Sequence, residues 1–126
     1  MLNFAYGMEM LMQHIWQHKM WSGAPELRTV DGRELEVIDQ GMLNTGPGPD
    51  FFNAKVRLGD AVWVGNVEVH VRASDWHMHG HDNDSAYRNV VLHVVSEDDC
   101  RICIDRREVP QTLLPLAPEV IEQYES

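Results

Sequence analysis

The chain has 126 residues, is 44% hydrophobic and 24% charged, and carries a formal net charge of −10. This length and composition fit one globular domain, residues 1–126, and exclude an intrinsically disordered chain. The acidic balance makes non-specific binding of nucleic acid unfavourable without excluding it, because basic side chains supply most of the affinity for phosphates. With neither a secretory signal nor the ~20 apolar residues of a membrane span, we expect a cytoplasmic protein with no membrane contact.

The first part of the chain predicts a helix, a hairpin and a loop. Apolar side chains recur at steps of three and four between residues 2 and 21, as on the buried face of a helix. Extended runs at residues 27–30 and 35–38 flank an Asp-Gly pair at residues 31–32, which is a strong hairpin signal. Residues 40–49 contain three glycines and two prolines and are expected to form a loop.

A second hairpin is the clearest element of the sequence. Apolar and polar side chains alternate over residues 51–58 and 61–72, around a turn at residues 59–60. The polar face of the second strand carries Glu68 and His70. Polar groups on a central strand are costly to bury unless they find partners or a metal ion, so this face is a candidate site.

Shorter elements complete the predicted fold. Ser74 and Asp84 could each cap a short helical turn, residues 89–95 resemble a buried strand, and residues 101–109 suggest a further strand. This order predicts an α+β fold, an α/β sandwich with an N-terminal helix, a mixed central sheet of about five strands and a short helix.

Three prolines interrupt the sequence after residue 109. The predicted core therefore spans residues 2–109 and is followed by a proline-rich tail, residues 110–126. Within this tail, residues 119–124 could form a last short helix.

Asp50, Glu68 and His70 form a pattern that is typical of a metal site. Two neighbouring carboxylates suit Mg²⁺ or Mn²⁺, which prefer oxygen ligands. His70 points to the same face as Glu68 and could orient or deprotonate a water molecule, or bind the ion itself. A two-residue hairpin turn would direct Asp50 away from Glu68, whereas a three-residue turn or a bulge would bring them together. The alternative is that Asp50 caps a turn, Glu68 pairs with Arg72 or Lys55, and His70 is a core histidine.

A second group of potential ligands follows in a polar segment. The group consists of His77, His79, His81, Asp82 and Asp84, of which His79, His81 and Asp84 are the favoured ligands of an additional site. Imidazole nitrogens at alternate positions could bind zinc, but nothing in the spacing fixes their geometry. A solvated loop is therefore the favoured interpretation, unless one or two of these side chains line the cleft beside Glu68, and zinc is a less favoured ion than Mg²⁺ or Mn²⁺.

Four distinctive segments resemble an uncharacterised bacterial domain family of unknown function. They are H-I-W-Q-H-K, L-N-T-G-P-G-P-D-F-F-N-A-K, G-N-V-E-V-H-V-R-A-S-D-W and H-G-H-D-N-D-S-A-Y-R-N-V-V-L-H-V-V, in this order along the chain. The resemblance implies little about activity. It does imply that longer members exist, of which this chain would be a short or truncated version.

The predicted order of helix, three strands, helix and strand is also similar to the PD-(D/E)XK phosphodiesterase superfamily, which includes restriction-endonuclease-like nucleases. This resemblance implies a restriction-endonuclease-like core in which Asp50 and Glu68 bind Mg²⁺ or Mn²⁺ and Glu9 assists from the first helix. His70 stands where the motif has lysine, which is a fixed cation. Lys55 on the neighbouring strand could replace that lysine.

The sequence therefore predicts a metal-dependent phosphodiesterase, a nuclease-like hydrolase that acts on nucleic acid. Arg57, Arg72 and Arg88 are the candidate contacts to substrate phosphate. One alternative is a catalytically inactive nuclease-like scaffold that serves as a protein-binding or homo-oligomerisation module, for which the acidic charge and the missing lysine argue. A further alternative is a zinc-dependent hydrolase that uses the histidines.

Overall fold

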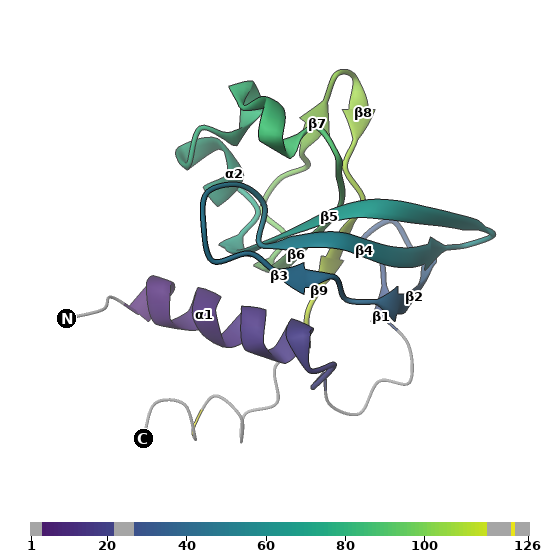
Figure 1. Cartoon of the computed structure of the whole chain (residues 1–126), viewed down its shortest axis with the longest axis horizontal. Helices are drawn as coiled ribbons and strands as arrows, with labels where there is room; N and C mark the ends of the chain where they lie inside the picture. Colours follow the sequence, from purple (N-terminus) through teal and green to yellow (C-terminus); the bar gives the residue numbers. More distant parts are fainter. Residues whose placement is uncertain (1–3, 22–26, 116–121, 123–126) are drawn as a thin grey trace.

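The computed structural model describes residues 4–21, 27–115 and 122. Within these ranges the chain forms a mixed sheet with few helices (Figure 1). The elements, in chain order, are α1 (Phe4–Gln17), β1 (Leu27–Arg28), β2 (Glu34–Asp39), β3 (Met42–Leu43), β4 (Phe51–Leu58), β5 (Ala61–Arg72), α2 (Asp75–Met78), η1 (His81–Asn83), η2 (Ser85–Tyr87), β6 (Val90–Glu97), β7 (Cys103–Ile104), β8 (Arg107–Glu108) and β9 (Gln111–Leu113).

Helix α1 forms where the sequence places apolar side chains on one face. Met12, Ile15 and Trp16 are at most 1% exposed and pack into the larger core. The indole Nε1 of Trp16 donates a 3.1 Å hydrogen bond to the carbonyl of Gln40, which ties the helix to the connection between β2 and β3. The helix prediction is confirmed, although α1 ends at Gln17. No described helix is long and apolar enough to span a bilayer.

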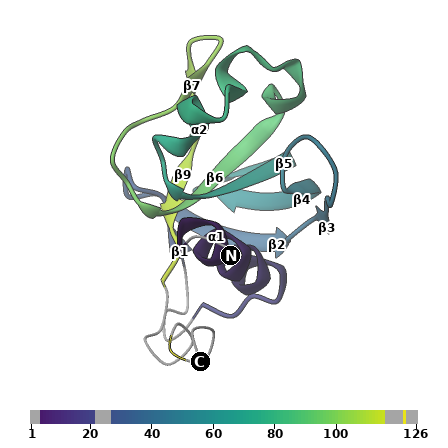
Figure 2. The same ribbon diagram turned by 90° about the vertical axis from the view of Figure 1, so that its left-hand side faces the viewer.

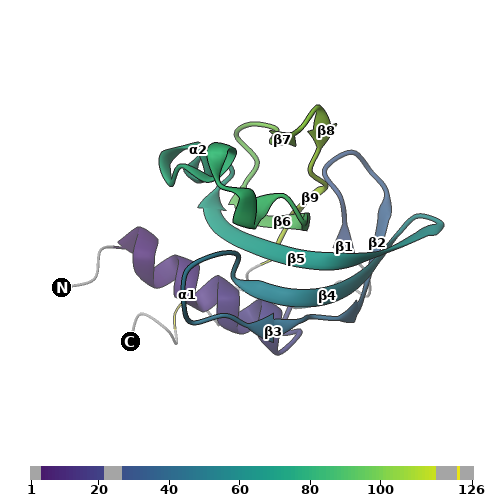
Figure 3. The same cartoon turned by 45° about the horizontal axis from the view of Figure 1, so that its top comes forward.

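The described strands form a seven-stranded sheet in the order β1-β2-β4-β5-β6-β9, with β3 paired to β4. Neighbours from β1 to β5 are antiparallel, whereas β6 is parallel to β5 and β9 is parallel to β6. The two edges meet through an antiparallel bridge between Thr29 and Thr112 and a 2.7 Å hydrogen bond from Val30 N–H to the carbonyl of Gln111. The sheet therefore curls into a nearly closed barrel (Figure 3).

The two faces of the sheet are covered by different elements (Figure 2). Helix α1 packs against one face and shares the larger core with strands β1 to β6. The smaller core lies on the other face, beneath α2 and the β7–β8 hairpin. It consists of Trp76, Tyr87, Val90, Ile102 and Val109.

The prediction of an α+β fold with a mixed sheet is confirmed, but the sheet is larger than the five strands expected. Strand β3 lies within the predicted loop, and β9 lies within the segment expected to be a tail. The strand predicted at residues 101–109 is wrong, because Asp105 and Arg106 adopt φ angles of 48° and 68° and reverse the chain. This segment instead forms β7 and β8, a separate two-stranded hairpin. Of the last predicted helix, residues 119–124, all but Glu122 lie outside the described residues.

A bulge in β4 sets the register that brings Asp50 beside Glu68. The hairpin turn between β4 and β5 spans two residues, which alone would direct the two side chains to opposite faces. The register shifts between Phe51 and Ala54, where Asn53 has a φ of 58°. One extra residue in β4 therefore moves Asp50 to the same face as Glu68, which is one of the arrangements that the sequence required.

Gly41 packs against this bulge and is expected to tolerate no side chain. Its φ is 90°, and an added Cβ would lie 2.7 Å from the carbonyl oxygen of Phe52. We expect Gly41→Ala to lower the free energy of unfolding by ~3 kcal/mol, of which ~1–2 kcal/mol comes from the backbone conformation and the rest from the clash. Gly32→Ala is a matched control, because Gly32 has a φ of 92° but no atom within 4 Å of an added Cβ. Urea unfolding of both variants checks the prediction, and equal losses would contradict it.

Candidate metal centre

Asp50 and Glu68 lie side by side at the start of β4 and in the middle of β5. The backbone N–H of Asp50 donates a 3.1 Å hydrogen bond to Glu68 Oε1. The carboxylate of Asp50 accepts hydrogen bonds from the N–H of Val69, at 2.7 Å to Oδ2, and from Gln13 Nε2, at 2.8 Å to Oδ1. Both oxygens of Asp50 are thus engaged, and Glu68 is the carboxylate that remains directed toward other side chains.

Two histidines contact the second oxygen of Glu68, and a third lies beside one of them. Glu68 Oε2 lies 3.3 Å from His70 Nε2 and 2.7 Å from His81 Nε2. His81 Nε2 is buried and has no hydrogen-bond partner in the described part of the chain, so the 2.7 Å contact is close but not aligned as a hydrogen bond. His79 Nδ1 completes the group at 3.2 Å from His70 Nε2. We call Glu68, His70, His79 and His81 the four-residue cluster.

The three histidines of the four-residue cluster lie close enough together to bind one metal ion. One nitrogen from each of the three histidines lies within 4.8 Å of the others. Metal–ligand bonds of about 2.0–2.2 Å at tetrahedral angles place neighbouring ligand atoms roughly 3.3–3.6 Å apart. The separations of 3.2 and 3.3 Å are near this spacing, whereas the 2.7 Å contact would have to lengthen by at least about 0.6 Å. His79 is exposed, so the cluster is accessible to solvent on that side.

The carboxyl groups of the site resist ionisation. Burial, followed by the charge of Asp50, raises the pKa of Glu68 far above its usual value of 4.5. Burial also raises the pKa of Asp50. On α1, burial, with smaller contributions from the charges of Asp50 and Asp75, raises the pKa of Glu9 to about 7. Without a cation beside it, Glu68 holds a proton at neutral pH.

The histidines of the cluster are held in the neutral form. Burial, followed by the proximity of His93, lowers the pKa of His70 far below its usual value of 6.5. Burial lowers the pKa of His81 to about 4. Neutral imidazoles keep the lone pairs that metal ligation needs. A neutral His70 cannot supply the fixed positive charge of the lysine in the PD-(D/E)XK motif, which it was considered to replace.

The other predicted catalytic and phosphate-binding residues are scattered. Lys55 is exposed and pairs in register with Val64, four residues before Glu68 and thus roughly 13 Å away along β5. Arg57 is exposed and pairs with Glu36 at 3.6 Å on β2. Neither residue lies beside the four-residue cluster.

Arg72 and Arg88 lie closer to the cluster. Arg72 follows Glu68 and His70 at alternate positions of β5, and its guanidinium lies 3.6 Å from Asp75. Arg88 follows η2 and lines a polar cavity. Asp84, predicted as a ligand, instead caps η2 by accepting a 2.9 Å hydrogen bond from the N–H of Ala86.

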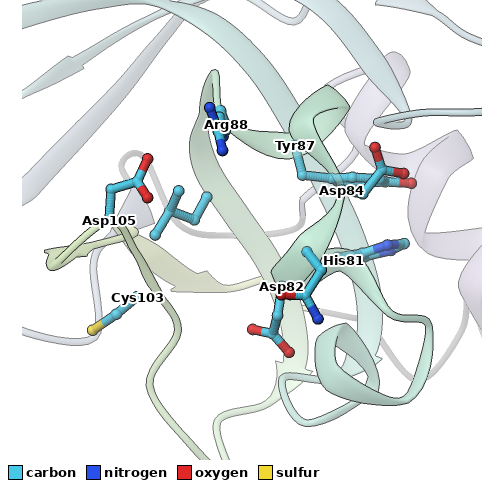
Figure 4. Close-up of a pocket in the computed structure, with 9 residues that line it drawn as sticks. His81, Asp82, Asp84, Tyr87, Arg88, Cys103 and Asp105 are labelled. Carbon is cyan, nitrogen blue, oxygen red and sulfur yellow. The ribbon is translucent and has the colours of Figure 1, made fainter.

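The polar cavity lies behind His81 and has a volume of about 300 Å³. Its walls are formed by His81, Asp82, Asn83, Asp84, Tyr87, Arg88, Cys103, Ile104 and Asp105. The rings of His81 and Tyr87 stack with their centroids 3.7 Å apart. In Figure 4 both rings extend away from Asp105 and Cys103, and Nε2 of His81 lies 2.7 Å from Glu68 Oε2.

Sequence reasoning missed two buried residues that contact the site. His93 Nε2 lies 2.7 Å from His70 Nδ1, and His93 Nδ1 lies 2.9 Å from Oε1 of Gln111 on β9. His93 is the lone ionisable side chain within residues 89–95, and that was a usable signal. Gln111 follows a proline in the predicted tail and offered no signal.

Comparisons with known proteins identify the family but no activity. No curated protein and no solved structure matches the chain. The likeness to the PD-(D/E)XK superfamily and its restriction-endonuclease-like core is not confirmed and stays a prediction. The predicted resemblance to an uncharacterised family is confirmed, because a family model matches residues 9–126. The chain belongs to this family, described as a protein of unknown function (DUF2851).

Proposed function

We propose that the protein is a hydrolase that uses a divalent transition-metal ion held by the four-residue cluster, with phosphodiesters as its class of substrate. One observation carries the proposal. Nitrogens of His70, His79 and His81 lie within 4.8 Å of one another, and Glu68 Oε2 lies 3.3 Å from His70 Nε2 and 2.7 Å from His81 Nε2. An oxygen and three nitrogens support Zn²⁺ or Mn²⁺ over Mg²⁺, which prefers oxygen ligands alone.

The remaining residues of the site have distinct roles in this proposal. A metal ion bound there would supply a Lewis acid that polarises the substrate and lowers the pKa of a water molecule. Glu9 is the proton acceptor, because its pKa of about 7 lies near the operating pH of a general base. Asp50 donates its N–H to Glu68 and so orients the ligand carboxylate. Arg72 and Arg88 are the candidate contacts to a phosphodiester.

Zinc binding tests the proposal directly, with His79 and His77 as a matched pair. His79 belongs to the cluster, whereas His77 is half-exposed and lies 2.6 Å from Asp82 outside it. We expect His79→Ala to weaken zinc binding at least about 10-fold, because it removes a ligand, and His77→Ala to leave binding unchanged. Isothermal titration calorimetry of the chelator-treated protein measures both. Equal effects of the two substitutions, or no binding by the folded wild type, would refute the metal site.

The same proteins test catalysis. Bis(p-nitrophenyl) phosphate is a simple phosphodiester whose hydrolysis is measured by absorbance. We expect turnover by the zinc- or manganese-loaded wild type and by His77→Ala, with at least about a 10-fold loss in His79→Ala, in line with its weaker metal binding.

A second candidate function is that of a protein-binding or self-association module. Val62, Trp63 and Val64 on β5 are 45–59% exposed. They pair with β4 on one side, and the pairing of β5 with β6 begins only at Asn66, so this apolar segment has a free edge in the described part of the sheet. A metal-loaded protein without phosphodiester turnover, and with a mass well above the 14.5 kDa of one chain by light scattering, would favour this candidate.

A further inference from the structure

A buried chain of hydrogen bonds leads from the four-residue cluster to the protein surface. His70 Nδ1 lies 2.7 Å from His93 Nε2, and His93 Nδ1 lies 2.9 Å from Gln111 Oε1. Gln111 Nε2 donates to Asp98 Oδ1 at 2.5 Å and to the carbonyl of Cys100 at 3.1 Å. His70, His93 and Gln111 are at most 1% exposed, so these contacts are shielded from water.

The contacts of Gln111, at the end away from the cluster, determine which group donates in each of these hydrogen bonds. The carbonyl of Cys100 only accepts, and Oδ1 of Asp98 also accepts a hydrogen bond from the guanidinium of Arg101. The amide NH₂ of Gln111 must therefore face them, which leaves its oxygen toward His93. Since that oxygen only accepts, His93 must carry its proton on Nδ1.

The position of the proton on His93 in turn determines the position of the proton on His70. His93 is fully buried, and its ring nitrogens contact only the imidazole of His70 and the neutral amide of Gln111, so a positive charge on His93 would be buried without an anionic partner. With its proton on Nδ1, neutral His93 has an unprotonated Nε2 that accepts from His70 Nδ1. His70 must therefore carry its own proton on Nδ1, and its Nε2 is left unprotonated.

We infer that His93 and Gln111 are positioning residues, which hold His70 in the tautomer that directs an unprotonated Nε2 into the four-residue cluster. This inference rests on the proposed metal site. A metal-ligating histidine is typically oriented by a hydrogen bond to its other nitrogen, and here that bond comes from a histidine that is itself oriented by an amide.

A purely structural role, the joining of β5, β6 and β9, would not need this tautomer. His70 Nε2 lies 3.3 Å from Glu68 Oε2 and 3.2 Å from His79 Nδ1. An unprotonated nitrogen and a carboxylate oxygen at this distance repel each other unless a proton or a metal ion lies between them. The chain of hydrogen bonds thus directs a lone pair to the place where the ion is proposed to bind.

The tautomer of His70 can be measured in the wild-type protein without any metal. Two-bond ¹H–¹⁵N correlation spectra of chelator-treated, ¹⁵N-histidine-labelled protein at neutral pH distinguish protonated from unprotonated ring nitrogens. We expect both His70 and His93 to be protonated on Nδ1 and not on Nε2. Protonation of His70 on Nε2 would overturn the inference, whatever the protein's affinity for metal.

A pair of variants on β9 then tests the consequence for binding. Gln111→Leu removes the acceptor for His93 and is expected to yield mixed tautomers of His70 and to weaken zinc binding about 10- to 100-fold. Thr112→Val is the matched control, since Thr112 is also buried and donates a 2.7 Å hydrogen bond to the carbonyl of Arg28, away from the cluster. This control is expected to leave both the tautomer and the zinc affinity unchanged.

The outcomes separate this inference from the metal site on which it rests. Tight zinc binding by Gln111→Leu, equal to that of Thr112→Val, would overturn the positioning role while leaving the metal site intact. The expected tautomer in a wild-type protein that binds no zinc would refute the metal site and leave the role of the hydrogen-bond chain in orienting His70. If Gln111→Leu does not fold, the wild-type spectrum alone decides the inference.

Discussion

Glu68→Gln is expected to weaken zinc binding at least about 100-fold, since changes to residues that only orient metal ligands already reduce affinity about 10- to 100-fold. Glutamine keeps the size of the side chain but loses the negative charge on the oxygen that His70 and His81 approach. The same substitution is expected to leave the metal-free protein at least as stable as the wild type near pH 7. Burial raises the pKa of Glu68 far above 4.5, so folding at pH 7 requires this carboxyl to take up a proton, which an amide does not need.

Thermal unfolding with and without zinc separates these two effects. A free zinc concentration of 100 times the dissociation constant stabilises a binding-competent protein by about 2.7 kcal/mol. We expect this gain in the wild type and in Glu36→Gln, a control in which an exposed carboxylate of β2 loses its contact with Arg57. We expect a gain of at most about 0.4 kcal/mol in Glu68→Gln, because this zinc concentration does not exceed the dissociation constant expected for the variant. The prediction fails if zinc stabilises Glu68→Gln as much as the wild type, or if this variant is markedly less stable than the wild type in the presence of chelator.

The sequence drew attention to the centre of the candidate site because the alternation of polar and apolar side chains along a strand is visible within a few residues. Glu68 and His70 stood out as polar residues on one face of a strand that was expected to be central, and β5 is indeed flanked by β4 and β6. Whether Asp50 would join them depended on a bulge. Asn53 tolerates a positive φ better than most residues, but asparagine alone does not identify a bulge, so the register could not be decided.

The parts that escaped prediction depend on contacts between distant segments. His81 reaches Glu68, and His79 reaches His70, only because the short helical segment after β5 folds back over the end of that strand. Gln111 reaches His93 through the parallel pairing of β6 with β9, which is separated from β6 by the β7–β8 hairpin. No local pattern encodes such a pairing. The hairpin itself was hidden, because its turn at Asp105 and Arg106 contains neither glycine nor asparagine.

The pKa values of the carboxyls and of the histidines in the site are shifted in opposite directions. Together these shifts predict how the stability of the metal-free protein depends on pH. Burial raises the pKa values of Glu9, Asp50 and Glu68, so each is ionised in the unfolded chain before it is ionised in the folded protein. Their contribution to stability is therefore complete at acid pH and is lost as the pH rises above about 4.5, the usual pKa of glutamate.

The buried histidines act in the opposite direction. Burial lowers the pKa values of His70, His81 and His93, so below the usual value of 6.5 the unfolded chain binds protons that the folded protein does not. Their contribution is complete above pH 6.5 and is lost as the pH falls toward about 4. Between pH 4.5 and 6.5 the carboxyls and the histidines oppose one another, and the free energy of unfolding is expected to change little.

Above pH 6.5 only the carboxyls still titrate, so the stability of the chelator-treated protein is expected to fall by on the order of 2 kcal/mol between pH 6.5 and 8. Urea unfolding at pH 5.5, 6.5 and 8 measures this loss. Glu68→Gln should show a clearly smaller loss, because it removes the carboxyl with the most strongly raised pKa. With saturating zinc the loss should also shrink, since a bound cation replaces the proton that Glu68 otherwise requires. A wild type whose stability rises from pH 6.5 to 8 in chelator would show that the carboxyls are ionised in the folded protein, and the argument for a cation among them would fail.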